Sequence, residues 1–92
     1  MEYRFAPGDR VRVKALYPLG HVRTPAYLRG KTGTVTARHG QYRNPEQLAY
    51  GRDGLPFVPL YEVTFELAAV WGQPGARDTV TADLYEHWLE RA

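Results

Sequence analysis

The chain has 92 residues, 43% of them hydrophobic, and this length suits one domain spanning residues 1–92. Seven Tyr, three Phe and two Trp can fill a core, whereas nine Gly and seven Pro disfavour long helices, so we expect a mostly β fold. The absence of Cys excludes disulfides, thiolate nucleophiles and sulfur-ligated metals within this chain. No apolar run approaches the length of about 18 residues that spans a membrane, and the start lacks a signal-peptide pattern, so we expect a cytoplasmic protein without membrane contact.

The charge is divided between the two halves of the chain. Residues 1–43 carry nine Arg and Lys against two acidic residues, a net +7, whereas residues 44–92 carry three against eight, a net −5. A basic half is typical either of a solvated face or of a nucleic-acid surface. Motifs have to decide between these two interpretations.

Two strands are predicted in the first half. After a turn at residues 7–9, Val11, Val13 and Ala15 alternate with basic residues in the period-2 pattern of a half-buried strand. A second strand is predicted from Thr34 to near residue 40, with threonines on its outer face.

Two long irregular segments adjoin these strands. Residues 17–29 hold two prolines and a glycine, which indicates a structured loop. Residues 43–59 hold three prolines and two glycines, with one helical turn predicted at residues 45–48 because proline suits a first turn. Loops of this length in small domains are usually functional or interfacial.

The second half begins with the clearest strand, in which Tyr61, Val63 and Phe65 alternate with polar residues. A short helical turn over residues 67–72, closed by glycine, and a last strand at residues 79–81 follow.

A helix is predicted at the C-terminus. Asp83 can cap it, and Leu84, Tyr85, Trp88 and Leu89 form an apolar stripe that would close one end of a barrel. The predicted fold is therefore a mostly β, SH3-like small barrel with a short C-terminal helix.

The residues themselves disfavour several kinds of catalysis. The chain has no Ser, which excludes serine catalysis. His21, His39 and His87 are separated by 18 and 48 residues and lack neighbouring Cys, so we predict no metal site in this chain. The aspartates sit at turns and strand ends, where such residues have structural roles.

One short resemblance points to RNA. The stretches PGDRVRVKAL and RGKTGTV loosely resemble the strand-turn-strand KOW motif of ribosomal and transcription-elongation proteins. That resemblance implies a barrel that binds RNA phosphates with its basic loops, and the basic half is compatible with it. The acidic half disfavours it, as do Glu62 and Glu66 on the polar face of the strand that contains Tyr61, so an RNA-binding barrel remains the alternative.

A second resemblance covers nearly the whole chain from Phe5 onward. The blocks FAPGDRVRVK, GHVRTPAYLRGKTGTV, HGQYRNPE, LYEVTFELAAVWG and TVTADLYEHWLE occur in the order seen in the C-terminal, SH3-like domain of the nitrile hydratase β subunit, and the chain resembles that family. The resemblance implies a subunit of a lyase that adds water to a nitrile to form an amide. It also implies that the chain is inactive alone.

The resemblance assigns roles to residues of the first loop. In the family, non-haem iron or non-corrin cobalt is held by the α subunit in a cysteine cluster whose thiolates are oxidised, and arginines of the β subunit hydrogen-bond those oxygens. The arginine of the Gly-His-x-Arg-x-Pro motif is Arg23 here. His21 is expected to support the loop, Arg29 to lie at the barrel surface or an interface, and Tyr27 to pack. No cofactor is expected in this chain itself.

The resemblance also implies partners. The familiar β subunit has a helical N-terminal half that this sequence lacks, so the chain resembles one part of a β subunit that is divided into two chains, as in thiocyanate hydrolase or the three-piece toyocamycin nitrile hydratase. We therefore expect a hetero-oligomer with a metal-bearing α subunit and a separate chain equivalent to the N-terminal half of the β subunit, without nucleic acid. A nitrile hydratase activator or metallochaperone, which shares the barrel, is a further alternative.

Overall fold

The computed structural model describes residues 3–15, 24–71 and 78–92, and most of its elements are strands. The strands are β1 (Arg10–Val13), β2 (Thr32–Tyr42), β3 (Val58–Glu66), β4 (Thr79–Tyr85) and β5 (Leu89–Arg91). The helical elements are α1 (Pro45–Ala49), α2 (Leu67–Trp71) and two 3-10 turns, η1 (Ala26–Leu28) and η2 (Glu86–Trp88). The predicted mostly β fold is confirmed.

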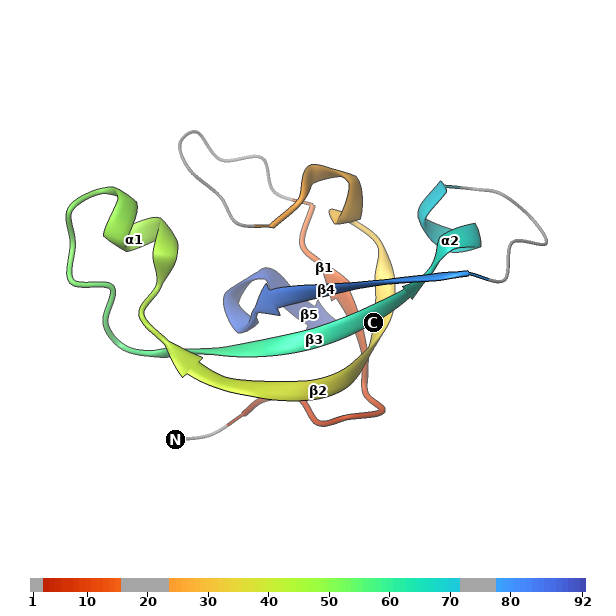
Figure 1. The fold of residues 1–92 in the computed structure, drawn as a ribbon, viewed down its shortest axis with the longest axis horizontal. Helices are drawn as coiled ribbons and strands as arrows, with labels where there is room; N and C mark the ends of the chain where they lie inside the picture. Colours follow the sequence, from red (N-terminus) through yellow and green to blue (C-terminus); the bar gives the residue numbers. More distant parts are fainter. Residues whose placement is uncertain (1–2, 16–23, 72–77) are drawn as a thin grey trace.

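The strands form one antiparallel sheet in the order β4-β3-β2-β1-β5 (Figure 1). Sequence neighbours therefore pair along most of the sheet, and β5 returns to the free edge of β1. The outer strands β4 and β5 are not paired with each other in the described part of the chain. Closure into the predicted SH3-like barrel is therefore not detected.

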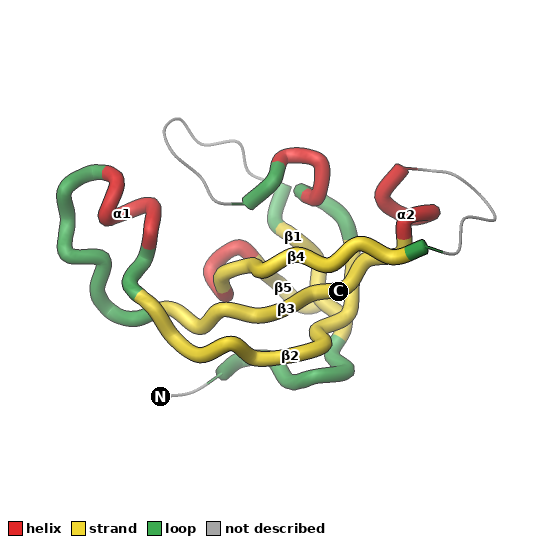
Figure 2. Tube along the Cα trace, in the orientation of Figure 1, coloured by secondary structure: helices red, strands yellow, loops and turns green. Residues whose placement is uncertain are grey.

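The hairpin of β2 and β3 is the longest part of the sheet, with strands of 11 and 9 residues. Its register shifts between Val35 and Ala37 and again between Arg38 and Gly40. Such bulges bend a strand and increase its twist. Figure 2 shows the hairpin curving across the molecule, with α1 and α2 at its opposite ends. β2 is longer at both ends than the sequence predicts: its first residues pair with β1, and the bulges interrupt the alternation near residue 40 without ending the pairing with β3.

The core consists of alternate strand residues, as the period-2 pattern predicts. Tyr61, Val63 and Phe65 of β3 are all fully buried. A Cβ at Gly33 of β2 would come within 2.8 Å of Phe65 Cδ1, so glycine lets the backbone of β2 lie directly against this ring. The other core residues are Phe5, Val11, Val13, Leu28, Val35, Val70, Leu84, Trp88 and Leu89.

Both predicted internal helical turns are confirmed, whereas Gly72, predicted to close the second one, lies outside the described residues. At α1, the side-chain oxygen of Asn44 accepts hydrogen bonds from the N–H groups of Glu46 (3.0 Å) and Gln47 (3.4 Å), and Pro45 occupies the first turn. Helix α2 follows β3 directly. No helix in the described ranges is long and apolar enough to cross a membrane.

The predicted C-terminal helix is wrong. Asp83 and Leu84 continue β4, which pairs with β3 as far as Tyr85, and only one 3-10 turn separates β4 from β5. Trp88 and Leu89 still reach the core, from the turn and from β5. The apolar spacing fits both conformations, and strand pairing with β3 and β1 decides between them because it satisfies the backbone through long-range partners.

A buried tyrosine joins the N-terminal segment to the C-terminal turn. The hydroxyl of Tyr61 donates to Glu86 Oε2 and accepts from the backbone N–H of Phe5 at 3.2 Å. The N–H of Arg4 donates to the same Glu86 oxygen at 2.9 Å. Burial, together with the hydrogen bond to Glu86, raises the pKa of Tyr61 to about 12.

We predict that Tyr61→Phe lowers the free energy of unfolding at neutral pH by about 1–3 kcal/mol, because the buried N–H of Phe5 loses its acceptor. The raised pKa means that the fold favours the protonated phenol. The stability that the protonated Tyr61 hydroxyl contributes to the fold is fully present below the unfolded pKa of about 10. It is lost as pH rises towards the folded pKa of about 12. Urea unfolding from pH 8 to pH 11.5 measures the difference in the free energy of unfolding between the wild type and Tyr61→Phe. This difference should decrease above about pH 10. A constant difference would contradict the assignment.

Candidate functional site

The two residues assigned to the site from the sequence, Arg23 and His21, lie outside the described residues. The structure instead shows the part of the loop that follows them, residues 24–30. That part contains the backbone that directly follows Arg23 in the sequence.

The base of the loop is fixed against the core. Thr24 is only 3% exposed and Leu28 is fully buried, so the segment is held at two points. At its end, the N–H of Gly30 donates to the carbonyl of Val13 at 2.7 Å, and the φ of Gly30 is 81°, which suits glycine. Tyr27, which we expected to pack, is 45% exposed, and its neighbour Leu28 fills the core instead.

Arg29, which we expected at the barrel surface or at an interface, makes contacts within the chain as well. Its side chain is half-buried, and Nη2 donates to the backbone carbonyl of Thr24 at 2.9 Å. Its guanidinium carbon lies 5.0 Å from the centroid of the buried Trp88 ring, a cation–π contact. Arg29 therefore links the first residue of the segment 24–30 to the core residue Trp88. The sequence could have suggested this only through the short spacing of five residues between donor and acceptor.

Trp88 connects this loop base to α1. Its indole N–H donates to Glu46 Oε1, and His87 Nε2 pairs with Glu46 Oε2. His87 Nδ1 is buried and has no hydrogen-bond partner among the described residues. The carboxylate of Glu46 thus joins α1 to the C-terminal turn. The contacting residues are so far apart in the sequence that no local motif predicts the contact.

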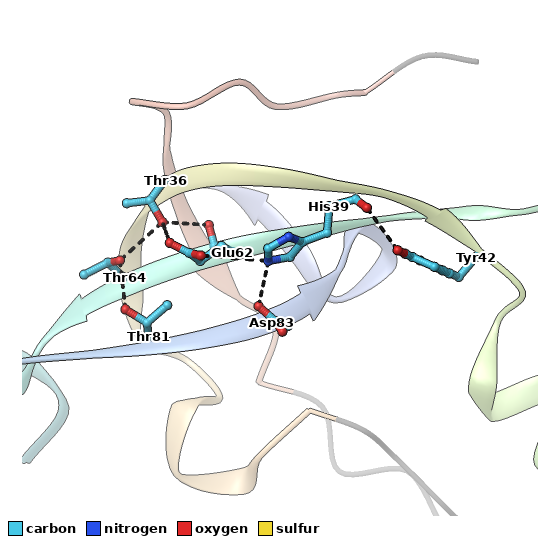
Figure 3. A network of polar contacts seen from close by, with 7 residues as sticks. All are labelled: Thr36, His39, Tyr42, Glu62, Thr64, Thr81 and Asp83. Atoms are coloured by element: carbon cyan, nitrogen blue, oxygen red, sulfur yellow. Dashed lines mark hydrogen bonds and ion pairs between the residues drawn. The ribbon is translucent and has the colours of Figure 1, made fainter.

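A second polar cluster covers the outer face of the sheet (Figure 3). His39 Nε2 lies 2.9 Å from Asp83 Oδ1 and 3.9 Å from Glu62 Oε2. Glu62 and Asp83 are cross-strand partners of like charge, and the imidazole of His39 lies within reach of both carboxylates. Thr36 also donates to the Glu62 carboxylate at 2.7 Å. The cluster satisfies its own polar groups and holds strands together.

A shallow hollow of about 210 Å³ lies beside this cluster, lined by Arg10, four threonines of the sheet face, Glu66 and Thr79. It is smaller than the roughly 300–1,000 Å³ of a typical small-molecule site. Its lining holds no buried charged group aimed inward, so it is a poor candidate for a substrate pocket.

No group of three or more His, Cys, Asp or Glu side chains that could hold a metal occurs in the described ranges. His39 has two carboxylates nearby and His87 has one, and both pair inside their own clusters. The described residues therefore offer no set of protein ligands for a metal ion.

Apart from Tyr27, the exposed large apolar side chains of the described ranges lie on one segment, residues 42–57, which includes α1 and stands at one end of the β2–β3 hairpin (Figure 1). Their exposed fractions range from 42% to 61%. They are Tyr42, Leu48, Tyr50, Leu55 and Phe57. Concentrated apolar exposure of this kind is typical of protein interfaces.

The fold and the site define a small β domain with a rigid loop base and an apolar exposed segment. The family model described as "Nitrile hydratase beta subunit, C-terminal" matches residues 1–91. The nitrile hydratase subunit beta of Pseudomonas chlororaphis is 38% identical over 89 residues, which are 96% of this chain and 40% of that protein. The chain therefore belongs to the family defined by the C-terminal domain of the nitrile hydratase β subunit, and the resemblance noted in the sequence is confirmed.

Thiocyanate hydrolase is also related. Its subunit alpha from Thiobacillus thioparus is 33% identical over 92 residues, covering 97% of this chain and 72% of that one. A solved structure of the recombinant apo-enzyme matches with a TM-score of 0.90 at 32% identity, over 99% of this chain and 78% of that one. The nitrile hydratase β subunits that match include cobalt-containing enzymes. The chain spans only 36% to 42% of the length of the matching nitrile hydratase β subunits.

Proposed function

We propose that this chain is a subunit of a nitrile hydratase-type lyase, which adds water to a nitrile to form an amide, and that it supplies Arg23 to the active site of a metal-bearing α subunit. The observation that carries the proposal is the family match over residues 1–91, which includes the Gly-His-x-Arg-x-Pro motif. The rigid base at residues 24–30 supports it, because a loop that presents one side chain to a partner benefits from a fixed anchor.

Arg23 would bind oxidised cysteine oxygens of the α subunit. A guanidinium carries a planar fork of donors that matches paired anionic oxygens, and it keeps its charge near neutral pH. Pro25 restricts Thr24 to extended backbone and so limits the conformations of the chain directly after the arginine. His21 would support the same loop.

The metal would belong to the partner. This chain has no Cys, and its described residues hold no cluster of metal ligands, so iron or cobalt would be bound entirely by the α subunit. This chain would contribute the charge-assisted hydrogen bonds of Arg23 and a surface that binds the α subunit.

We further propose two partners, the α subunit and a separate chain equivalent to the N-terminal half of a β subunit. The similarity to thiocyanate hydrolase subunit alpha, 33% identical over 92 residues, supports an assembly of several different chains. The exposed apolar segment at residues 42–57 supports burial in an assembly. Thiocyanate is a second candidate substrate on the same grounds.

Co-expression with the neighbouring genes tests this function. The chain should co-purify with a subunit that carries the cysteine cluster, and only the complete set should convert an aliphatic nitrile or thiocyanate. The isolated chain should retain no stoichiometric iron, cobalt or zinc after gel filtration and show no hydratase activity. Tight metal retention by the isolated chain would contradict the proposal in favour of a metallochaperone. Failure to co-purify, together with salt-sensitive RNA binding, would favour the RNA-binding alternative.

A further inference from the structure

We propose that Arg29 is a positioning residue that fixes the backbone next to Arg23 and thereby sets where the Arg23 guanidinium meets the partner. The inference rests on the function proposed above for Arg23. It concerns contacts that lie wholly within residues 24–31, α1 and the C-terminal turn.

The first step is the attachment of Thr24. The two ends of segment 24–31 are held in different ways. At the far end, main-chain bonds join it to β1: Gly30 N–H to Val13 O at 2.7 Å, and Val13 N–H to Lys31 O at 2.9 Å. At the near end, the carbonyl of Thr24 accepts from Nη2 of Arg29 at 2.9 Å. Among the described residues, the end that adjoins Arg23 is thus bonded through a side chain, in addition to the burial of Thr24, whereas the far end is bonded through the main chain of β1.

The second step is the immobility of Arg29 itself. Its guanidinium lies over the ring of Trp88, which is 3% exposed, and the indole N–H of that ring donates to Glu46. The carboxylate of Glu46 is in turn paired with His87. A long side chain normally loses up to about 2 kcal/mol of rotamer freedom when it is ordered, but a planar fork stacked on a buried ring is already ordered.

The third step is the effect on Arg23. Consecutive Cα atoms lie about 3.8 Å apart across an ordinary peptide bond, so holding Thr24 restricts the position from which Arg23 extends. A misplacement of about 1 Å in a residue that orients reacting groups can lower the rate by about a hundredfold. Lysine cannot replace Arg29 fully, because an ammonium group lacks the flat surface that stacks on Trp88 while an edge N–H reaches the carbonyl.

Backbone relaxation of the ¹⁵N-labelled full chain tests the attachment directly. The amide order parameter of Thr24 should be near about 0.85 in the wild type and fall below about 0.6 in Arg29→Met, while Val13 stays rigid in both. Arg12→Met is the matched control, since Arg12 is an exposed arginine of β1 paired with Glu90, and it should leave Thr24 unchanged. If Arg29→Met does not fold, Arg29→Lys is measured instead, with an intermediate decrease expected. An unchanged order parameter at Thr24 overturns the inference.

Kinetics of the assembled enzyme test the consequence. Arg29→Met should lower kcat by about tenfold and change KM by less than about twofold. Its effect should disappear in an Arg23→Lys background, because Arg29 acts through Arg23. Losses that multiply fully in the double variant overturn the inference. If Arg23→Lys alone has the wild-type rate, the proposed function fails, whereas the order parameter of Thr24 still decides whether Arg29 positions this backbone.

Discussion

Arg23→Lys is expected to lower kcat of the assembled enzyme by about ten- to a hundredfold, without loss of metal or subunits. Lysine keeps the positive charge but loses the planar fork of donors, so one of the oxidised cysteine oxygens is left without its partner. A lost charge-assisted hydrogen bond costs about 1.5–3 kcal/mol in a dry interface, and the whole of it appears in the rate if the bond acts on the transition state.

The measurement is kcat in the reconstituted complex, with metal content and subunit stoichiometry determined for every variant. From the sequence alone, Arg29→Lys would be the control, since Arg29 is predicted to lie at the surface or at an interface. Its bond to Thr24 and its stacking on Trp88 remove it from that role. Arg12→Lys is the better control, because Arg12 is exposed on β1 and its expected effect is negligible. A fully metallated Arg23→Lys complex with wild-type kcat would refute the assignment.

Local patterns predicted those parts of the fold that local physics decides. The alternation at Tyr61, Val63 and Phe65 predicts β3 because burial on one face imposes a period of two. Pro45 predicts the start of α1 because proline suits the first turn of a helix, and the structure adds Asn44 as the capping residue. The prediction of a C-terminal helix was wrong because the spacing of Leu84 and Trp88 suits either a helix or a strand. Pairing with distant strands decides between the two conformations.

The candidate site shows the same division. The sequence identifies a loop with Arg23 through a motif, and the motif is local. The role of Arg29 depends on Trp88, which lies 59 positions further along the chain, and the orientation of Trp88 depends on Glu46. Such contacts between distant residues leave no periodic or compositional signal, so the sequence alone does not predict them.

Trp88→Ala is expected to produce the largest loss of stability, about 3–5 kcal/mol, the range for removing a large aromatic side chain from a core. Trp88 is 3% exposed and contacts three different parts of the fold. Its removal leaves a cavity in the core, takes the stacking surface from Arg29 and takes a donor from the Glu46 carboxylate. Because small domains are stable by only about 5–15 kcal/mol, such a loss would bring the chain close to unfolding. Urea unfolding followed by far-ultraviolet circular dichroism measures it.

Trp88→Phe separates packing from hydrogen bonding. Phenylalanine fills much of the same volume and keeps an aromatic face for Arg29, but it has no N–H for Glu46, so a loss of about 1–3 kcal/mol is expected. The two variants together therefore divide the contribution of Trp88 between the core and the link to α1. If Trp88→Ala costs less than about 1 kcal/mol, Trp88 does not carry the connection between the core, α1 and the loop base, and the rigidity attributed to Arg29 loses its support.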